Sequence, residues 1–168
     1  MNRFFSLSAV LILLGVSSCQ AGAAGELSLG DPESCSGVTV VVNFGILSED
    51  SLKQCVVVGD GPAVAHEILS VAGVTTEGTI TYGDQVVCRV NGLPSESEAF
   101  TVEGEQPHIE TCADMAPAFA YWALWVKQSA EADWAYAEEG VGTLELVAGD
   151  TIGLAFSTGG ETPVPETE

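Results

Sequence analysis

The sequence predicts an α+β fold in which one helix packs across a mixed β-sheet. Three observations carry this prediction: a β-branched run at residues 38–44, one apolar helical stripe soon after it, and several short strand patterns in the rest of the chain. The chain has 168 residues, of which 46% are hydrophobic, so it can bury a core within one domain.

The first half of the domain predicts two strands and then the helix. Residues 38–44 predict the opening strand, and residues 55–58 predict the second. A Gly-Asp-Gly-Pro sequence then starts a helix over residues 62–72, with Pro62 in its first turn and Gly73 after its end. Three apolar residues at intervals of four form the buried stripe of this helix: Val64, Ile68 and Ala72.

Further strand patterns follow the helix. Residues 79–82 and 86–90 predict strands, and Asn91-Gly92 after them is the strongest short turn signal in the chain. Residues 94–111 predict a polar, acidic loop that can hold a short strand at residues 99–102.

The last third of the chain adds the remaining strands. Residues 118–127 fit either a strand or a helix, and residues 134–136 alternate as a strand does. Residues 143–147 and 151–156, joined by a turn at 148–150, predict a closing hairpin. This order of elements predicts a β-grasp-like mixed sheet with one main helix.

The N-terminus has the pattern of a secretory signal peptide over residues 1–23, with a short positive segment followed by an apolar run that ends at Val16. Two processing routes fit this segment. Val16-Ser-Ser-Cys19 resembles a bacterial lipobox, in which Cys19 receives lipid, whereas Ala21-Gly-Ala23 fits ordinary signal-peptidase cleavage. Either route predicts export to the cell surface or the exterior, and the lipobox route adds a lipid anchor as the one contact with the membrane.

The folded domain is expected between two flexible ends. Residues 24–37 are rich in small residues and predict a tether. Residues 158–168 have no periodic apolar residues and predict a disordered tail. The domain itself is therefore expected at residues 38–157.

The cysteines that remain after export predict two disulfides in an oxidising compartment. They are Cys35, Cys55, Cys88 and Cys112. Of the three possible pairings we favour Cys35–Cys55 with Cys88–Cys112, because each closes a modest loop around adjacent strand patterns. The chain has no Cys-x-x-Cys spacing, and His66 and His108 are not paired in spacing, so we predict no metal site and no cofactor.

Charge and motifs exclude several classes of function. The formal net charge is −20, from 24 acidic and 4 basic residues. Nucleic acids and anionic membrane surfaces are bound through Lys and Arg, so neither is an expected partner, whereas a cationic partner is compatible. The sequence also lacks a Gly-x-Ser-x-Gly elbow and a His-Glu-x-x-His motif, and we predict that the protein is not an enzyme.

Several motifs of the chain resemble, in their order, those of a known family. They are the Val-Thr-Val-Val-Val-Asn-Phe-Gly strand from residue 38, the helical segment 61–73, Val87-Cys-Arg-Val-Asn-Gly-Leu-Pro94, Cys112, Ala120-Tyr-Trp-Ala-Leu-Trp125, Asp133-Trp-Ala-Tyr136 and Gly149-Asp150. Over residues 38–156 this order is similar to the transcobalamin-like C-terminal domains, especially their small exported bacterial relatives. The resemblance implies a β-grasp-like fold and ligand binding outside the cytoplasm, with a cobalamin-like compound among the ligands to consider.

The candidate ligand-binding residues are four aromatic side chains: Tyr121, Trp125, Trp134 and Tyr136. Aromatic residues serve both cores and recognition surfaces, so these rings fit either a buried core or an exposed patch. We interpret the chain as an exported, surface-anchored, non-enzymatic binding module for a small-molecule ligand. The alternative is an accessory subunit that docks to an envelope transporter or to another surface protein.

Overall fold

The computed structural model of this chain describes residues 26–47, 50–159 and 165. The predicted signal peptide and Cys19 lie outside the described residues, as do residues 160–164 and 166–168 of the predicted tail. Within the described ranges, no helix has the length and apolar character that crossing a membrane needs.

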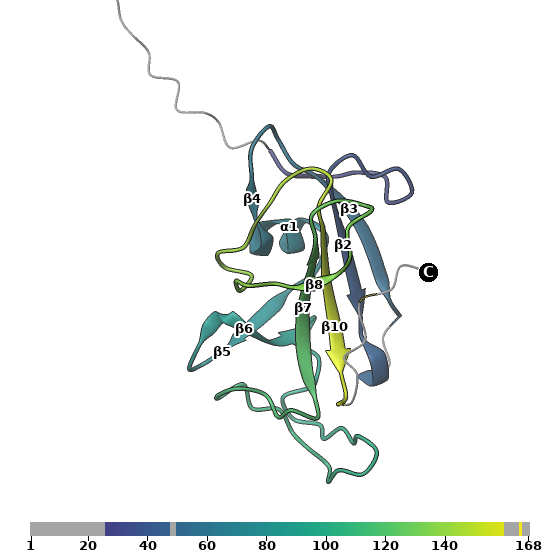
Figure 1. The fold of residues 1–168 in the computed structure, drawn as a ribbon. Coiled ribbons are helices and arrows are strands. Elements are labelled where there is room, and N and C mark those ends of the chain that lie inside the picture. Colours follow the sequence, from purple (N-terminus) through teal and green to yellow (C-terminus); the bar gives the residue numbers. More distant parts are fainter. Residues whose placement is uncertain (1–25, 48–49, 160–164, 166–168) are drawn as a thin grey trace, which may run out of the picture.

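A six-stranded mixed sheet forms the centre of the molecule, in the order β1-β3-β2-β10-β7-β8 (Figure 1). Its strands are β1 (Ser28–Leu29), β2 (Val38–Asn43), β3 (Leu52–Val57), β7 (Tyr121–Lys127), β8 (Ala135–Tyr136) and β10 (Thr151–Ser157), with a short 3-10 helix, η1 (Gly45–Leu47), after β2. β10 runs parallel to β2 and antiparallel to β7, so the last strand of the chain lies in the middle of the sheet. The fold is therefore α+β with mostly strands, as the sequence predicts.

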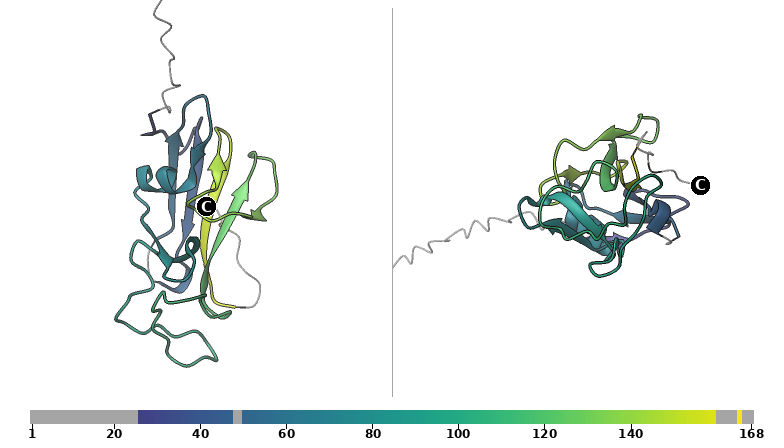
Figure 2. Two further views of the ribbon diagram at one scale, coloured as in Figure 1. Left: turned by 90° about the vertical axis from the view of Figure 1, so that its left-hand side faces the viewer. Right: turned by 90° about the horizontal axis from the view of Figure 1, so that it is seen from below.

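The helix α1 (Ala65–Val71) lies against one face of this sheet (Figure 2). The sequence predicts a helix from residue 62, but β4 (Ala63–Val64) is extended and pairs with β9 (Glu145–Leu146). Val64 has a φ of −72° and a ψ of 136°, so the helix begins only at the next residue. Pairing with a segment far along the chain thus shortens the predicted helix at its N-terminus.

Two predicted strand arrangements are wrong. Residues 143–147 and 151–156 do not form a hairpin, because β9 pairs with β4 while β10 pairs with β2 and β7. β5 (Thr76–Thr79) ends where a strand was expected to begin, and a turn then leads into its antiparallel partner β6 (Gly83–Val90). The segment whose sequence fits either a strand or a helix forms the strand β7.

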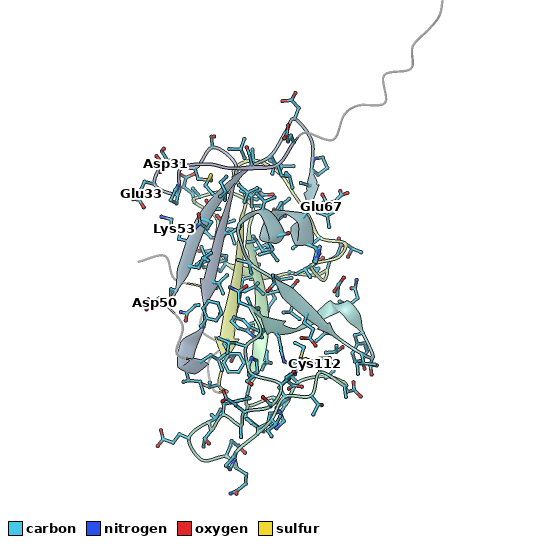
Figure 3. All side chains as sticks on the ribbon, turned by 180° about the vertical axis from the view of Figure 1, so that it is seen from behind. Asp31, Glu33, Asp50, Lys53, Glu67 and Cys112 are labelled. Atoms are coloured by element: carbon cyan, nitrogen blue, oxygen red, sulfur yellow. A yellow bond between two sulfur atoms is a disulfide. The ribbon has the colours of Figure 1, made fainter. Side chains whose placement is uncertain are left out.

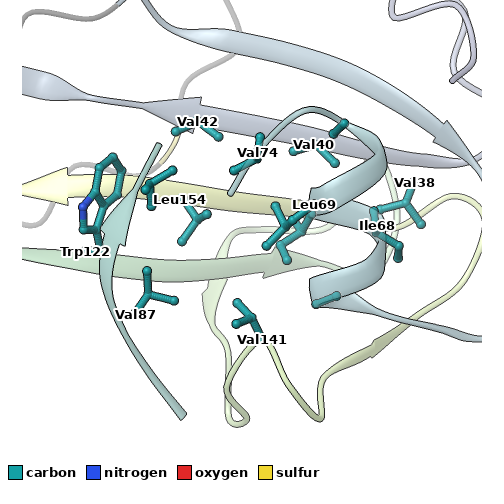
Figure 4. Packing of buried hydrophobic residues seen from close by; sticks show 14 of the residues in the cluster. Val38, Val40, Val42, Ile68, Leu69, Val74, Val87, Trp122, Val141 and Leu154 are labelled. Carbon is teal, nitrogen blue, oxygen red and sulfur yellow. The ribbon is translucent and has the colours of Figure 1, made fainter. Parts of the chain in front are cut away.

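The main core lies between α1 and the inner face of the sheet, which we define as the face that α1 covers (Figure 4). Its fully buried members include Val38, Val40, Val42, Ile68, Leu69, Ile152 and Leu154. Trp122 belongs to this core, and the centroid of its ring lies 5.4 Å from those of Phe44 and Phe156. Its indole Nε1 donates a hydrogen bond of 2.9 Å to the carbonyl oxygen of Leu93.

Both predicted disulfides, Cys35–Cys55 and Cys88–Cys112, are present. The first joins the N-terminal segment to β3, the strand with which β1 also pairs. The predicted tether is therefore part of the folded domain from residue 26 onward. The second disulfide joins β6 to the long loop that precedes β7, and Figure 3 locates Cys112 in this loop.

Arg89 of β6 holds two separate points of this loop through polar contacts. Its side chain is buried, and Nε donates to the carbonyl oxygen of Pro94 at 2.9 Å. Nη2 donates to the carbonyl oxygen of Glu110 at 2.5 Å, and Nη1 donates to Oε1 of Glu77 at 2.7 Å. The loop is thus tied to β6 by a guanidinium group as well as by a disulfide.

Candidate ligand-binding surface

The outer face of the sheet, opposite the face that α1 covers, carries a second and smaller apolar cluster. Alternation along β7 sends Ala123 and Trp125 to this face. Ala155 of β10 completes the buried part of the cluster, and Tyr121 and Trp134 pack against it. The outer face is therefore apolar at its centre.

The structure brings the four candidate aromatic residues together on this outer face. Trp125 and Tyr136 are cross-strand partners, and their rings stack with centroids 3.9 Å apart and an interplanar angle of 23°. Tyr136 is 50% exposed, whereas Trp125 is only 8% exposed. Tyr121 and Trp134 are half-buried. A ligand can therefore reach the ring of Tyr136, while the face of Trp125 that Tyr136 covers is closed to it.

A basic side chain contacts the same cluster. Nζ of Lys127 lies 5.5 Å from the ring centroid of Trp134 and donates a hydrogen bond of 3.2 Å to the carbonyl oxygen of Ala130. A cation at this distance is attracted by the negative face of the indole ring. Lys127 therefore helps to hold Trp134 on the outer face.

Two cavities border Tyr136. The larger has a volume of about 620 Å³ and lies between β7, β8 and the residues that lead into β9. Its lining includes four acidic residues and, among the residues that the structure describes, no Lys or Arg. The acidic residues are Asp133, Glu138, Glu139 and Glu145. The smaller cavity, of about 230 Å³, lies between β6 and β7 and shares Tyr136, Glu138 and Glu139 with the larger one.

The surface around Tyr136 thus combines an exposed ring, apolar strand residues and carboxylates. Ligand sites are typically concave and largely apolar, with a few polar groups that fix the ligand's orientation. Carboxylates beside an aromatic ring favour a positively charged group, because both the carboxylates and the ring face attract cations. The arrangement suits a ligand with a flat or apolar body and a positive charge.

Two residues that the sequence analysis did not single out complete the outer face. Gly153 of β10 lies between Val41 and Trp125 in the register of the sheet. A Cβ atom at Gly153 would lie 2.8 Å from Cβ of Pro165 and 3.0 Å from Cη2 of Trp134. Pro165 is buried, although the sequence predicts it within a disordered tail. A glycine inside a strand is the signal that could have revealed this contact, because it often marks the close approach of another group.

The histidines and cysteines that the structure describes do not gather at this surface. His66 is exposed on α1, and Nε2 of the half-buried His108 lies 3.4 Å from Oε2 of Glu110. Ligand atoms of Glu110, Cys88 and Cys112 lie within 4.8 Å of one another, but the two sulfurs are joined in a disulfide. Metals bind cysteine in its thiolate form, and a cysteine in a disulfide is not a thiolate. This group therefore offers no thiolate ligand while the disulfide is intact.

Comparison of the chain with protein-family models, with curated proteins and with solved structures finds no match. The transcobalamin-like resemblance of the sequence therefore remains a prediction.

Proposed function

We propose that this protein is an exported, non-enzymatic binding module whose ligand contacts Tyr136. The observation that carries the proposal is the position of this residue: its half-exposed ring stacks on buried Trp125 and borders both cavities. A ring supported from beneath is held in one orientation, so a flat ligand can pack on it at a small entropic cost.

The ligand class follows from the charges around this ring. The larger cavity is lined by four acidic residues, and the whole chain has a formal net charge of −20. Such a field attracts cationic molecules and repels anionic ones. We therefore propose a small ligand with a planar or apolar body and at least one positive charge.

The strand order supports a β-grasp fold and, with it, the family resemblance. β2 and β3 form an antiparallel pair, α1 follows, and β10 inserts parallel to β2 between that strand and β7. β-grasp domains combine a hairpin, a helix and a last strand that lies parallel to the first in the centre of the sheet, so this strand order favours that assignment. By family analogy, a cobalamin-like compound belongs among the planar ligands that should be tested.

Export is supported by the two disulfides, which are consistent with an oxidising, extracytoplasmic location. We propose that Cys19 is lipidated and anchors the domain at the cell surface. Mass spectrometry of the mature N-terminus tests this anchor. A diacylglyceryl group on Cys19 would support it, whereas a free amine at Ala24 would contradict it.

The binding proposal is tested by titrating the intrinsic tryptophan fluorescence with corrinoids, haem-like compounds and cationic aromatic amines. At least one of these compounds should quench Trp125 or Trp134, and raising the ionic strength should weaken its binding because salt screens the carboxylates. The variant Tyr136→Ala should weaken that binding about 10-fold or more, since the ligand loses an aromatic contact surface.

The matched control is Tyr82→Ala. Tyr82 is 46% exposed, close to the 50% of Tyr136, but it lies in the turn between β5 and β6. This variant should bind the ligand as the wild type does. If no compound in the series changes the fluorescence of the folded protein, or if both variants lose binding equally, the proposed site is wrong.

A second candidate function, docking to an envelope protein, is favoured by exposed apolar residues on two neighbouring segments elsewhere. Ile80 is 84% exposed and Met115 is 61% exposed. The turn that carries Ile80 is hydrogen-bonded to the loop just before Met115, through the carbonyl oxygens of Cys112 and Ala113. Exposed apolar patches mark protein interfaces. Co-purification from solubilised membranes, lost in Ile80→Ser but retained in Tyr136→Ala, would favour this function.

A further inference from the structure

On the outer face, the ring of Pro165 occupies the space that the missing side chain of Gly153 leaves, and we call this space the pocket over Gly153. We propose that the pocket over Gly153 is a recognition site for proline in an extended peptide, and that Pro165 of the same chain is its resident ligand. This site lies beside the proposed small-molecule surface, and the inference does not depend on that surface binding anything.

The floor of the pocket is built by small residues in the middle of the sheet. Gly153 lies between Val41 on β2 and Trp125 on β7, and Ala155 and Ala123 are partners in the next row on this face. The inward residues of the same strand, Ile152 and Leu154, are large and fully buried. The loss of side-chain volume is therefore confined to the outer face, where it leaves room for another group.

A glycine in a central strand is unfavourable unless something uses the space. It weakens the strand because it has no side chain to pack and loses more backbone freedom on folding than other residues do. Here the space is used: a Cβ at Gly153 would come within 2.8 Å of Cβ of Pro165 and within 3.0 Å of Cη2 of Trp134. The absent side chain is thus what admits the proline ring and the indole ring together.

The walls are aromatic, which suits a proline ligand. Trp134 touches the pocket directly, and Trp125 flanks Gly153 in the sheet register. Proline-rich peptides bind in aromatic-lined grooves, because the pyrrolidine ring packs flat on an aromatic face and the extended chain loses little entropy. Nε1 of Trp125 is buried and has no hydrogen-bond partner among the described residues, so a peptide carbonyl would find a donor there.

The burial of Pro165 cannot be ascribed to charge. The last eleven residues contain three glutamates and no basic residue, and the whole chain has a formal net charge of −20. Like charges repel, so electrostatics oppose the approach of Pro165 to the domain. The contact of Pro165 with Gly153 and Trp134 is therefore an apolar one, and salt should strengthen it rather than weaken it.

The test uses the full chain with Pro165→Ala, which empties the pocket, and a synthetic peptide of residues 158–168 as the probe. The variant should bind this peptide with a dissociation constant of about 0.1 mM or below, because a tethered tail at an effective concentration of about 1 mM then fills about nine-tenths of the wild-type sites. The wild type should bind it at least about 10-fold more weakly, since its own Pro165 occupies the site. A peptide in which Pro165 is replaced by Ala should not bind either protein.

Indole N–H resonances in NMR spectra report which ring responds. Peptide binding should shift the resonances of Trp125 and Trp134 and leave that of Trp122 unchanged, because Trp122 lies in the inner core. Raising the salt concentration should strengthen binding of the peptide, whereas it should weaken binding of a cationic ligand at Tyr136. The opposite salt responses keep the two proposals distinguishable.

A second variant adds a methyl group at Gly153, the residue below Pro165. Adding Gly153→Ala to Pro165→Ala should abolish peptide binding, because the new methyl group occupies the space of the proline ring. Adding Gly61→Ala instead should leave binding unchanged, since nothing lies within 4 Å of a Cβ at that position. The inference is overturned if Pro165→Ala binds the peptide no better than the wild type, or if the peptide shifts Trp122 rather than Trp134.

Discussion

Replacing Arg89 by Met should lower the free energy of unfolding by more than the Arg89–Glu77 ion pair contributes to it. Arg89 is 5% exposed and donates three side-chain hydrogen bonds. Two of these bonds go to backbone carbonyl oxygens, those of Pro94 and Glu110, in buried surroundings. The third goes to Glu77, whose side chain is 55% exposed.

The magnitude follows from what each partner loses. A buried acceptor left without a donor costs about 1–3 kcal/mol, so the two carbonyl oxygens account for about 3 kcal/mol together. Glu77 can be hydrated once its partner is gone, and an exposed ion pair is worth less than about 1 kcal/mol. Arg89→Met should therefore lower the free energy of unfolding by about 3 kcal/mol, most of it through the loop carbonyls.

Urea denaturation followed by tryptophan fluorescence measures this difference. Glu77→Gln is the matched control, because it removes the ion pair and leaves both carbonyl contacts in place; it should cost less than about 1 kcal/mol. Arg89→Lys should fall between the two, since a single ammonium cannot reach all three acceptors. Equal losses in Arg89→Met and Glu77→Gln would refute the reasoning, because they would assign the stability to the ion pair.

Two further predictions concern the core and the second disulfide. Ile68→Ala, which truncates a fully buried side chain of α1 (Figure 4), should cost about 3 kcal/mol in urea denaturation, whereas Glu67→Ala on the exposed side of the same helix should cost less than about 0.5 kcal/mol. The double variant Cys88→Ala/Cys112→Ala, which opens a loop with a sequence separation of 24, should lower the unfolding free energy by about 3 kcal/mol, and added reductant should then change its stability only through Cys35–Cys55.

The sequence predicted the features that local patterns encode. The β-branched run at 38–44 forms β2, and the disulfide pairing is correct because each bridge closes a loop between neighbouring elements. The turn at 148–150 also forms: Gly149 has a φ of +98°, and Val147 N donates to Oδ2 of Asp150. Turn chemistry is local, so it can be read without knowing what the flanking strands pair with.

The strand partners could not be read in this way. The segments on either side of the turn pair with β4 and with β2, which lie far away in the sequence. A parallel pair between the first and last long strands leaves no turn signal between its members, since its connection is most of the domain. The predicted helix was too long because its first residues form β4, whose partner β9 also lies far away in the sequence.

The sequence named the four aromatic residues of the candidate site, but it did not predict how deeply each is buried or what it contacts. The four aromatic residues do share one face, because alternation on β7 and pairing with β8 fix their direction. Sequence alone could not tell that Trp125 lies beneath Tyr136, nor that Pro165 and Trp134 meet over Gly153. Those contacts depend on the crossing of segments that are adjacent only in space.

The contrast between the two faces of β10 is the reason to expect binding on the outer one. A sheet face that meets only water normally carries polar residues, in alternation with the apolar residues of the covered face. By alternation the outer residues of β10 are Thr151, Gly153, Ala155 and Ser157, and the two in the middle are small and apolar rather than polar. Small apolar residues gain little from facing water, and here they lie under aromatic rings and a proline. The outer face is thus built as a second, shallow core whose cover comes from β8 and from Pro165, and a cover of this kind can be exchanged for a ligand more easily than the inner core can be opened.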